Sequence, residues 1–346
     1  MPLPSLGVVI VSFNASTELL DCLESLLAAP DVALHIVVVD NASSDDTVAQ
    51  FEAWASGAAP YVPPEDLPFA LTAAPKPLAL VDAQANARTN APATPQITLI
   101  RSAVNLGLAC LAANPAINRF WVLNPDSVVA PETPLAFATY HGDAARFSLM
   151  GGRVTYVDPP DHILSDGGII NYRTGVTSNL HQGRDASQTP APQTEFDFIS
   201  GASMVASRAF YETAGPLPEE YFLYYEEVDW ALRRRDLPLV FCPEARVYHR
   251  VGSSIGSRTM TRVATPFSTY FLYRARMMFL RRYAKGGLAG AWAYALAKAG
   301  QLALKGHRAE AVALLAGSWG GAPPKAVRAR LSVEAAKLAF DRPAKP

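Results

Sequence analysis

Two apolar runs near the start of the chain indicate strands that are buried on both faces. Residues 7–13 (GVVIVSF) and 34–39 are rich in β-branched side chains, a pattern typical of a parallel sheet. Between them, leucines recur at helical spacing over residues 18–27, and a second helix is predicted to begin near Thr47. This order predicts right-handed βαβ units, and therefore an α/β fold with a Rossmann-like, mostly parallel sheet flanked by helices.

Polar side chains follow three of the predicted strands at their carboxyl ends. Asn14 follows the first strand and Asp40 follows the second, while an apolar run at residues 120–123 ends in NPD at 124–126. Proline cannot extend a central ladder, so the third strand stops there and presents Asp126. Ligands bind at the carboxyl ends of strands in open parallel sheets, which makes these side chains candidates for a binding site.

Further short apolar runs predict additional strands. They cover residues 97–100, 149–156, 169–172 and 239–241. Residues 196–206 are mostly apolar around Gly201 and Ala202, which predicts a strand that bends where another group approaches closely.

The pattern is interrupted between residues 57 and 96, where eight prolines and many alanines leave little periodicity. This composition predicts an inserted loop or a disordered excursion, and we favour a surface lobe over a binding role. After Thr265 the pattern becomes helical. We therefore predict a first domain over residues 1–260, which contains the insertion, and a helical C-terminal extension over residues 261–346.

The predicted C-terminal helices combine aromatic and basic side chains. Residues 267–284 carry four arginines among aromatic residues. Two interpretations stay open: these helices pack on the sheet, or they present a face to an anionic membrane surface, as basic amphipathic helices do.

Composition narrows the class of protein. With 346 residues and 50% hydrophobic content, the chain can bury a large core. The net charge of -1 gives no reason to expect a nucleic-acid partner. Cys22, Cys110 and Cys242 are far apart, and we expect them to be reduced in a cytosolic context. The N-terminus does not resemble a signal peptide, and no apolar run approaches the roughly 20 residues needed to span a bilayer.

The segment from Tyr221 to Ser254 carries the strongest candidate chemistry. An aromatic run at residues 221–225 precedes the acids of EEVD at 226–229, and His249 follows a short apolar strand. Carboxylates beside aromatic side chains suit a group that takes a proton in a sugar-lined pocket. A simpler interpretation is also open, because acids favour the first turn of any helix and a lone histidine is most often structural.

Seven ordered stretches resemble a known family. They are VVIVSFN at 8–14, VVVDNASSD at 37–45, NLGLA at 105–109, LNPDSVV at 123–129, FISGASMV at 198–205, YFLYYEEVDWALR at 221–233 and VYHRVGSS at 247–254. Over most of residues 6–260 the chain resembles a family 2 glycosyltransferase with a GT-A fold, of the rhamnosyltransferase-like branch.

The resemblance implies an activity and a location. The reaction would be inverting, metal-dependent transfer of a sugar from a UDP- or dTDP-sugar to a hydroxyl of a glycan or lipid-linked acceptor. Such a step belongs to cell-surface polysaccharide synthesis. It would take place in the cytoplasm, with peripheral association at the inner face of the membrane as the alternative.

The resemblance also implies roles for the matching residues. The nucleotide-binding residues would be Ser12, Asn14, Asp40, Asn41, Asn105 and Asn124. Asp126 and His249 would bind a divalent metal, Mg²⁺ or Mn²⁺, at the diphosphate. Glu227 occupies the position of the catalytic base, and Asp229 would support it. The sugar and the acceptor would contact Gly201, Ala202, Glu226 and Trp230.

The chemistry of glycosyl transfer agrees with these roles. A carboxylate within hydrogen-bond reach of the acceptor hydroxyl can take its proton, and one base without a covalent nucleophile predicts inversion. Two other classes stay open. A nucleotidyltransferase would need a glycine- and lysine-rich loop where this chain has SFNAST, and a non-catalytic nucleotide-binding scaffold would lack the acids that are present here.

Overall fold

The computed structural model of the chain describes residues 2–83, 97–101, 104–140, 146–187, 195–251, 256 and 262–340. The chain divides into two compact units, each formed by three segments. Unit 1 comprises Met1–Gly168, Asn179–Pro216 and Ala231–Arg250. Unit 2 comprises Ile169–Ser178, Leu217–Trp230 and Val251–Pro346.

Unit 1 is built on a sheet in the order β3-β4-β2-β1-β5-β11-β7-β12-β6, with β8 beside β7. All neighbours from β3 to β5 are parallel, as are β7 and β12. The pairings of β11, β6 and β8 are antiparallel. The strands are β1 (Ser5–Ser12), β2 (Ala33–Asp40), β3 (Leu80–Ala83), β4 (Ile97–Arg101), β5 (Arg119–Leu123), β6 (Ser127–Val129), β7 (Leu149–Tyr156), β8 (Ile163–Ser165), β11 (Ser203–Ser207) and β12 (Val240–His249).

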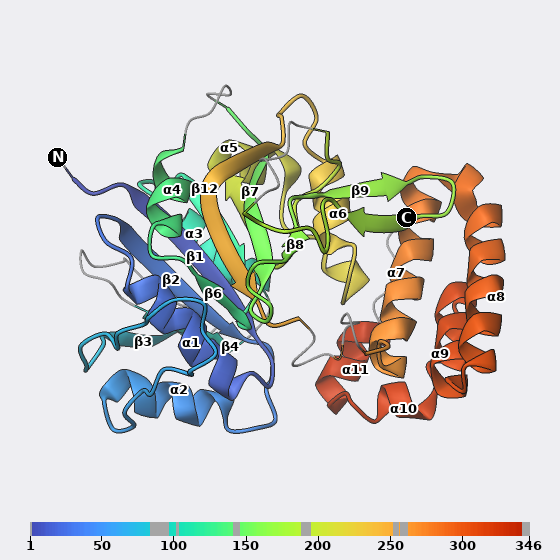
Figure 1. Cartoon of the computed structure of the whole chain (residues 1–346), viewed down its shortest axis with the longest axis horizontal. Helices are drawn as coiled ribbons and strands as arrows, with labels where there is room; N and C mark the ends of the chain where they lie inside the picture. The colour runs from blue at the N-terminus through green and yellow to red at the C-terminus, as the bar shows by residue number, and fades with distance from the viewer. Residues whose placement is uncertain are drawn as a thin grey trace. The chain divides into compact units, whose positions relative to one another are not determined.

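Helices cover both faces of this sheet, as Figure 1 shows. They are α1 (Ser16–Leu27), α2 (Thr47–Ser56), α3 (Val104–Ala112), α4 (Thr133–Thr139) and α5 (Arg208–Ala214). α1, α2 and α4 share a core with Trp121, whose ring meets Phe137 of α4 edge-on at 4.9 Å between centroids. The neighbouring Phe120 points to the other face and meets Tyr211 of α5 at 5.4 Å. The alternation along β5 therefore builds two helix-covered layers.

Parallel register brings three strand ends to one edge of the sheet. Ser12 lies opposite Asp40, and Ile10 lies opposite Leu123, so β1, β2 and β5 end side by side. α3 packs closely against β1 and β2 because Gly107 has no side chain. A Cβ atom at that position would lie 2.8 Å from side-chain atoms of both strands.

The described part of the proline-rich insertion, residues 57–83, is fastened to unit 1. β3 pairs with β4 and extends the sheet, so the prediction that the insertion lacks regular structure is wrong there. Lys76 forms an ion pair with the buried Glu24 of α1 at 2.7 Å, and Trp54 Nε1 donates to the same carboxylate. Composition does not reveal such partners. The remainder of the insertion lies outside the described residues.

Unit 2 is mainly helical. A two-stranded sheet of β9 (Gly168–Asn171) and β10 (Val176–Asn179) joins helices that cluster around aromatic rings. Phe271 is fully buried, and its ring lies within 5.2 Å of the centroids of Phe222, Phe267 and Tyr270. The helical elements are η1 (Glu219–Tyr221), α6 (Glu226–Leu232), α7 (Pro266–Tyr283), η2 (Lys285–Gly287), α8 (Leu288–Leu304), α9 (Arg308–Trp319), α10 (Lys325–Arg328) and α11 (Val333–Phe340).

The predicted α/β class, with a mostly parallel sheet flanked by helices and a helical C-terminal region, is confirmed. One predicted element differs in extent. The strand expected from residue 196 begins only at Ser203, because Ser203 N donates to Ser200 O in a turn. The described part of the helical region ends in two short helices, α10 and α11, because Ser332 Oγ accepts from Ala335 N and starts the second one. None of the described helices is long and apolar enough to cross a membrane.

We expect Lys76→Met to destabilise unit 1, because the Glu24 carboxylate would remain buried without a cation. Removing one partner of a buried pair costs about 3 kcal/mol or more. Urea unfolding followed by circular dichroism measures the change. Arg101→Met is the matched control, because its ion pairs with Glu52 and Asp82 are half-exposed and are each worth less than about 1 kcal/mol. Equal losses in the two variants would contradict the expectation.

Candidate functional site

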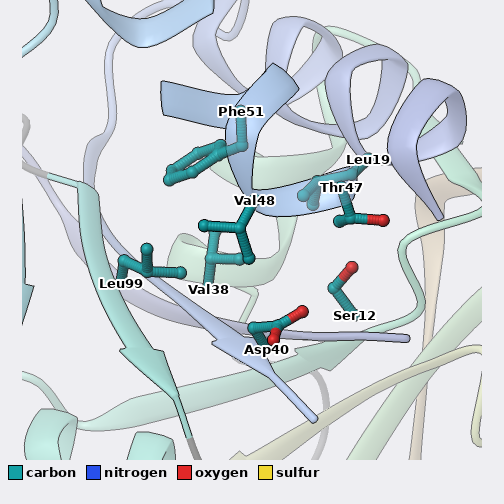
Figure 2. Close-up of a pocket in the computed structure, with 8 residues that line it drawn as sticks. All are labelled: Ser12, Leu19, Val38, Asp40, Thr47, Val48, Phe51 and Leu99. Atoms are coloured by element: carbon teal, nitrogen blue, oxygen red, sulfur yellow. The ribbon is translucent and has the colours of Figure 1, made fainter. Parts of the chain in front are cut away.

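The ends of β1 and β2 form one wall of a narrow pocket, closed on the other side by α1 and α2. Figure 2 shows Ser12, Asp40 and Thr47 with their oxygen atoms along one side of this pocket. Its apolar lining comes from Leu19, Val38, Val48, Phe51 and Leu99. Ser12 Oγ and Asp40 Oδ1 are buried, and neither has a hydrogen-bond partner in the part of the chain that the structure describes. The pocket has no room for a water molecule in this conformation, so a ligand with an N–H or O–H group would reach both atoms only after the surrounding loops move apart.

The loops that follow β1 and β2 hold each other through polar contacts. Asn14 N donates to Ser43 Oγ at 2.9 Å, and Ser44 N donates to Asn14 Oδ1 at 2.8 Å. Asn41 N donates to Ser12 O at 2.8 Å, which joins the two strand ends. Asn14 and Ala42 have φ values of 49° and 61°, a conformation that L residues adopt at a cost and that is concentrated at functional sites. The predicted residues Ser12, Asn14, Asp40 and Asn41 therefore lie together.

A second polar group lies where β5 ends. His249 Nε2 lies 2.9 Å from Asp126 Oδ1 and 3.4 Å from Asn124 Nδ2. His249 is the last residue of β12 and pairs with Ser127, which explains how residues so far apart in sequence meet. Its other ring nitrogen, Nδ1, is buried and has no partner in the described part of the chain.

Three other predicted residues lie at the same edge of the sheet. Asn124 N donates to Ala202 O at 3.0 Å, so Gly201 and Ala202 lie beside the end of β5, just before β11. Asn105 is half-buried in the first turn of α3, which follows β4 at the same edge of the sheet. The structure thus gathers all the unit 1 residues that sequence analysis singled out along one sheet edge.

The Asp126–His249 pair has the donor atoms for a divalent cation. One carboxylate and one imidazole nitrogen face each other, and both side chains are about nine-tenths buried. No group of three His, Cys, Asp or Glu side chains suited to a metal occurs among the described residues. The pair fits a hard cation only if substrate oxygens supply most of the coordination sphere.

The acidic start of α6 belongs to unit 2 and follows a strained aromatic turn. Phe222, Tyr224 and Tyr225 have φ values of 65°, 68° and 69°. This conformation costs about 1–3 kcal/mol for each residue that is not glycine and persists only where surrounding contacts enforce it. Tyr225 Oη donates to Gly175 O and receives a hydrogen bond from Arg276 Nε, which are contacts of that kind.

The two glutamates after this turn have raised pKa values. Burial raises the pKa of Glu226 to about 7. Burial, and then the nearby charge of Glu226, raise the pKa of Glu227 to about 8. Glu226 Oε2 is buried, and no hydrogen-bond partner for it occurs in the described part of the chain. A carboxyl with such a pKa suits general acid–base chemistry.

Asp229 and Trp230 are placed differently from the glutamates. Asp229 is fully buried and accepts hydrogen bonds from Tyr221 Oη at 2.9 Å and from Arg282 Nη1 at 2.6 Å. Trp230 is 0% exposed. In this structure, therefore, Asp229 belongs to an internal ion pair, and Trp230 offers no surface to an acceptor.

Sequence analysis missed several residues that complete these groups. Thr47 lines the pocket, and its Oγ1 accepts a hydrogen bond from Ala15 N at 3.0 Å. Its place in the polar run SSDDT after β2 is the only sequence signal for it. Arg282 neutralises Asp229 from a helix 53 residues further along the chain, for which the sequence carries no signal.

Polar groups lie at the carboxyl edge of the mostly parallel sheet of unit 1, which is where α/β proteins of this class commonly bind ligands. The profile of one family, described as Glycosyl transferase family 2, matches residues 7–66. This range contains both strand ends and all but one of the pocket residues. The match supports a glycosyltransferase. Among curated proteins, none matches the chain.

Several solved glycosyltransferase structures are loosely similar. One is the mannosyltransferase PcManGT from Pyrobaculum calidifontis in complex with GDP-Man and Mn²⁺, at 13% identity and a TM-score of 0.48, covering 98% of this chain and 79% of that one. Another is GalNAc-T7 with UDP, GalNAc and Mn²⁺, at 12% identity and a TM-score of 0.46, covering 81% of this chain and 48% of that one. A third is TarS residues 1–349 from S. aureus, at 10% identity and a TM-score of 0.42, covering 80% of this chain and 66% of that one.

We expect Glu226→Gln to lower the pKa of Glu227 from about 8 toward the ordinary value of a glutamate, because it removes the neighbouring negative charge. Carbon-13 NMR titration of the glutamate carboxyl groups measures the change. Glu310→Gln, a substitution in α9, is the control and should leave that titration unchanged. A Glu227 pKa that is ordinary in the unmodified chain, or unmoved by Glu226→Gln, would contradict the expectation.

Proposed function

We propose that this chain is an inverting, metal-dependent glycosyltransferase with a GT-A fold, of the rhamnosyltransferase-like branch. The observation that carries the proposal is the pocket at Ser12 and Asp40. Two buried oxygen atoms lack partners there, and the family match covers the same strand ends. A nucleotide offers the N–H and O–H groups that such atoms need.

In this proposal the nucleotide part of a UDP- or dTDP-sugar binds in unit 1. Asp40 Oδ1 accepts from the base or the ribose, and Ser12 and Asn14 hold the adjoining atoms. Asn41, Asn105 and Asn124 border the nucleotide along the same sheet edge. Gly201 and Ala202, beside Asn124, contact the sugar. Hydrogen bonds from backbone N–H groups to side chains of the facing loop keep the pocket in shape before the donor arrives.

Asp126 and His249 are the residues that would hold a divalent cation, Mg²⁺ or Mn²⁺. When bound, the cation supplies positive charge at the diphosphate leaving group. Asp126 contributes the carboxylate oxygen. His249 contributes a ring nitrogen, and Asn124 Nδ2 lies beside it at 3.4 Å.

Glu227 is the proposed proton acceptor. In its ionised form Glu227 takes the proton of the acceptor hydroxyl, and its raised pKa makes that carboxylate a stronger base than an ordinary glutamate. A single displacement by that hydroxyl inverts the anomeric centre. Glu226 tunes the base through its charge, and Asp229 supports it indirectly, because its pairing with Arg282 fixes the first turn of α6. The proposed acceptor is a glycan or lipid-linked hydroxyl in cell-surface polysaccharide synthesis.

We expect Glu227→Gln to reduce sugar transfer by about 10²–10⁴-fold, because the amide cannot take a proton. Transfer and donor hydrolysis are measured with UDP-, dTDP- and GDP-sugars and Mn²⁺. Donor affinity, measured by calorimetry, should be unchanged. Glu212→Gln on the surface of α5 is the matched control and should keep full activity.

Three outcomes of that experiment would contradict the proposal. If the unmodified chain and Glu227→Gln turn over at equal rates, Glu227 is not the catalytic base. Nucleotide binding without transfer to any acceptor favours a non-catalytic scaffold. Release of pyrophosphate from a nucleoside triphosphate and a sugar phosphate favours a nucleotidyltransferase.

A membrane surface is the proposed setting for this reaction, at the inner, cytoplasmic face. α8 and α9 expose large apolar side chains, among them Leu304 at 91% and Trp319 at 50%. Trp292 and Trp319 stack at 6.5 Å between ring centroids. Lys298 and Lys305 add positive charge on the same helix pair. Tryptophan with basic residues is the combination that anchors helices at anionic bilayer surfaces.

We expect the protein to float with vesicles that contain anionic phospholipid, and less with vesicles of neutral lipid. The double variant Trp292→Ala/Trp319→Ala should lose most of this binding, and Leu3→Ala, an exposed apolar control in unit 1, should retain it. High salt should weaken binding, since each basic residue contributes about 1 kcal/mol near an anionic surface. No flotation with anionic vesicles at low salt would remove the membrane proposal.

A further inference from the structure

Helix α1 carries two acids that are almost completely buried. Asp21 is 1% exposed and Glu24 is 0% exposed, although both are ionisable residues within a helix. Such residues are rarely buried without partners. Glu24 is matched by Lys76, Trp54 and Ala74 N. Asp21 has a different set of partners, and they lead to the candidate site.

Arg250 joins Asp21 to the Asp126–His249 pair. Its guanidinium donates to Asp21 Oδ2, and it also reaches Asp66 Oδ1 of the insertion at 3.3 Å. Its backbone N donates to Asp126 O at 2.9 Å. Arg250 directly follows His249. It contacts α1, the insertion and the backbone of Asp126, whose carboxylate faces the imidazole of His249.

The insertion reaches the same place. Tyr61 Oη donates to Asp21 Oδ1 at 2.7 Å, so both oxygens of that carboxylate are occupied. Leu67 and Phe69 pack against Tyr248 and its apolar neighbours, with the rings of Phe69 and Tyr248 5.7 Å apart. Polar and apolar contacts therefore fasten residues 61–69 beside the end of β12.

We propose that Arg250 is a positioning residue, fixed by Asp21 and Tyr61, which holds the end of β12 so that His249 faces Asp126. Residues 57–83 are then part of the site's frame rather than an appendage. The consequence for donor binding rests on the proposed function. Asp21, Tyr61 and Arg250 act by fixing the backbone at residues 249–250. If that backbone shifts, the 2.9 Å contact between His249 Nε2 and Asp126 Oδ1 is lost.

Substitutions at both ends of this link test the proposal in the full chain. Arg250→Met removes the guanidinium, and Asp21→Asn removes the charge that it meets. Arg250→Lys keeps the positive charge but lacks the planar guanidinium group. It should therefore cause a smaller defect than Arg250→Met. Arg101→Met is the control, because Arg101 also contacts the insertion, at Asp82, but is exposed and lies away from His249.

The first readout needs no donor. Hydrogen exchange of the free protein should rise on the order of tenfold in peptides covering 57–69 and 246–250 for Arg250→Met and Asp21→Asn. The control should not change these peptides. If hydrogen exchange is unchanged in both variants, the claim that Arg250 and Asp21 hold residues 57–69 beside the end of β12 is wrong.

The second readout is affinity. The dissociation constants of Mn²⁺ alone and of UDP or dTDP with Mn²⁺ should weaken by about 10–100-fold for Arg250→Met, as is typical when a residue that orients a metal-binding side chain is lost. The double variant with Asp21→Asn should weaken binding by less than the product of the single effects, because the two residues form one unit. Affinities equal to those of Arg101→Met would overturn the positioning role. If the unmodified chain binds neither nucleotide, the proposed function fails, while hydrogen exchange and Mn²⁺ affinity still decide this proposal.

Discussion

The parallel pairing of β1 with β2 and β5 is the constraint on which the rest of unit 1 depends. This register sets Ser12 opposite Asp40 and brings the end of β5 beside both. A shift of one residue would turn every side chain of β1 to the opposite face and dismantle the pocket. The register is secured because β1 is buried between two layers of helices, and α3 approaches it through Gly107. The same packing that stabilises the core therefore sets the positions of the polar atoms.

The acidic side chains of this chain differ in whether a cationic partner lies beside them. Asp229, Asp21 and Glu24 are buried, but each meets an arginine or a lysine and further donors. Glu226 and Glu227 are half-buried neighbours, and desolvation raises the pKa of both carboxyls. The same kind of side chain is therefore held in an ion pair at Asp229 and has a raised pKa at Glu227.

The fold and much of unit 1's site could be predicted because they depend on local patterns. The β-branched runs identify β1 and β2, and the strand order places Asn14, Asp40 and Asp126 at one edge without knowledge of any contact. The contacts that could not be predicted join distant residues. Asp21 meets Arg250 across 229 positions, and Glu24 meets Lys76 across 52. A periodicity or a motif describes a neighbourhood along the chain, and an ion pair between distant elements leaves no trace in it. The prediction for the described part of the insertion was wrong for this reason, since its prolines were visible in the sequence and its partners on α1 were not.

Buried polar atoms without hydrogen-bond partners connect the sequence patterns with the contacts seen in the structure. A folded chain pairs nearly all of its buried polar groups, because an unpaired one costs about 1–3 kcal/mol. In the part of the chain that the structure describes, buried side-chain atoms without partners are Ser5 Oγ, Ser12 Oγ, Asp40 Oδ1, Ser127 Oγ, Glu226 Oε2, His249 Nδ1 and Arg276 Nη1. Sequence analysis had selected four of these residues, Ser12, Asp40, Glu226 and His249, on unrelated grounds, from strand ends and motif order. Their agreement is informative because a motif says nothing about hydrogen bonding, and a count of unpaired atoms says nothing about motifs. The fold satisfies Asp21 and Glu24 through long-range partners, so it has the means to pair buried acids. Residues that combine such an unpaired atom with a motif position are therefore the ones to substitute first when ligand binding is measured.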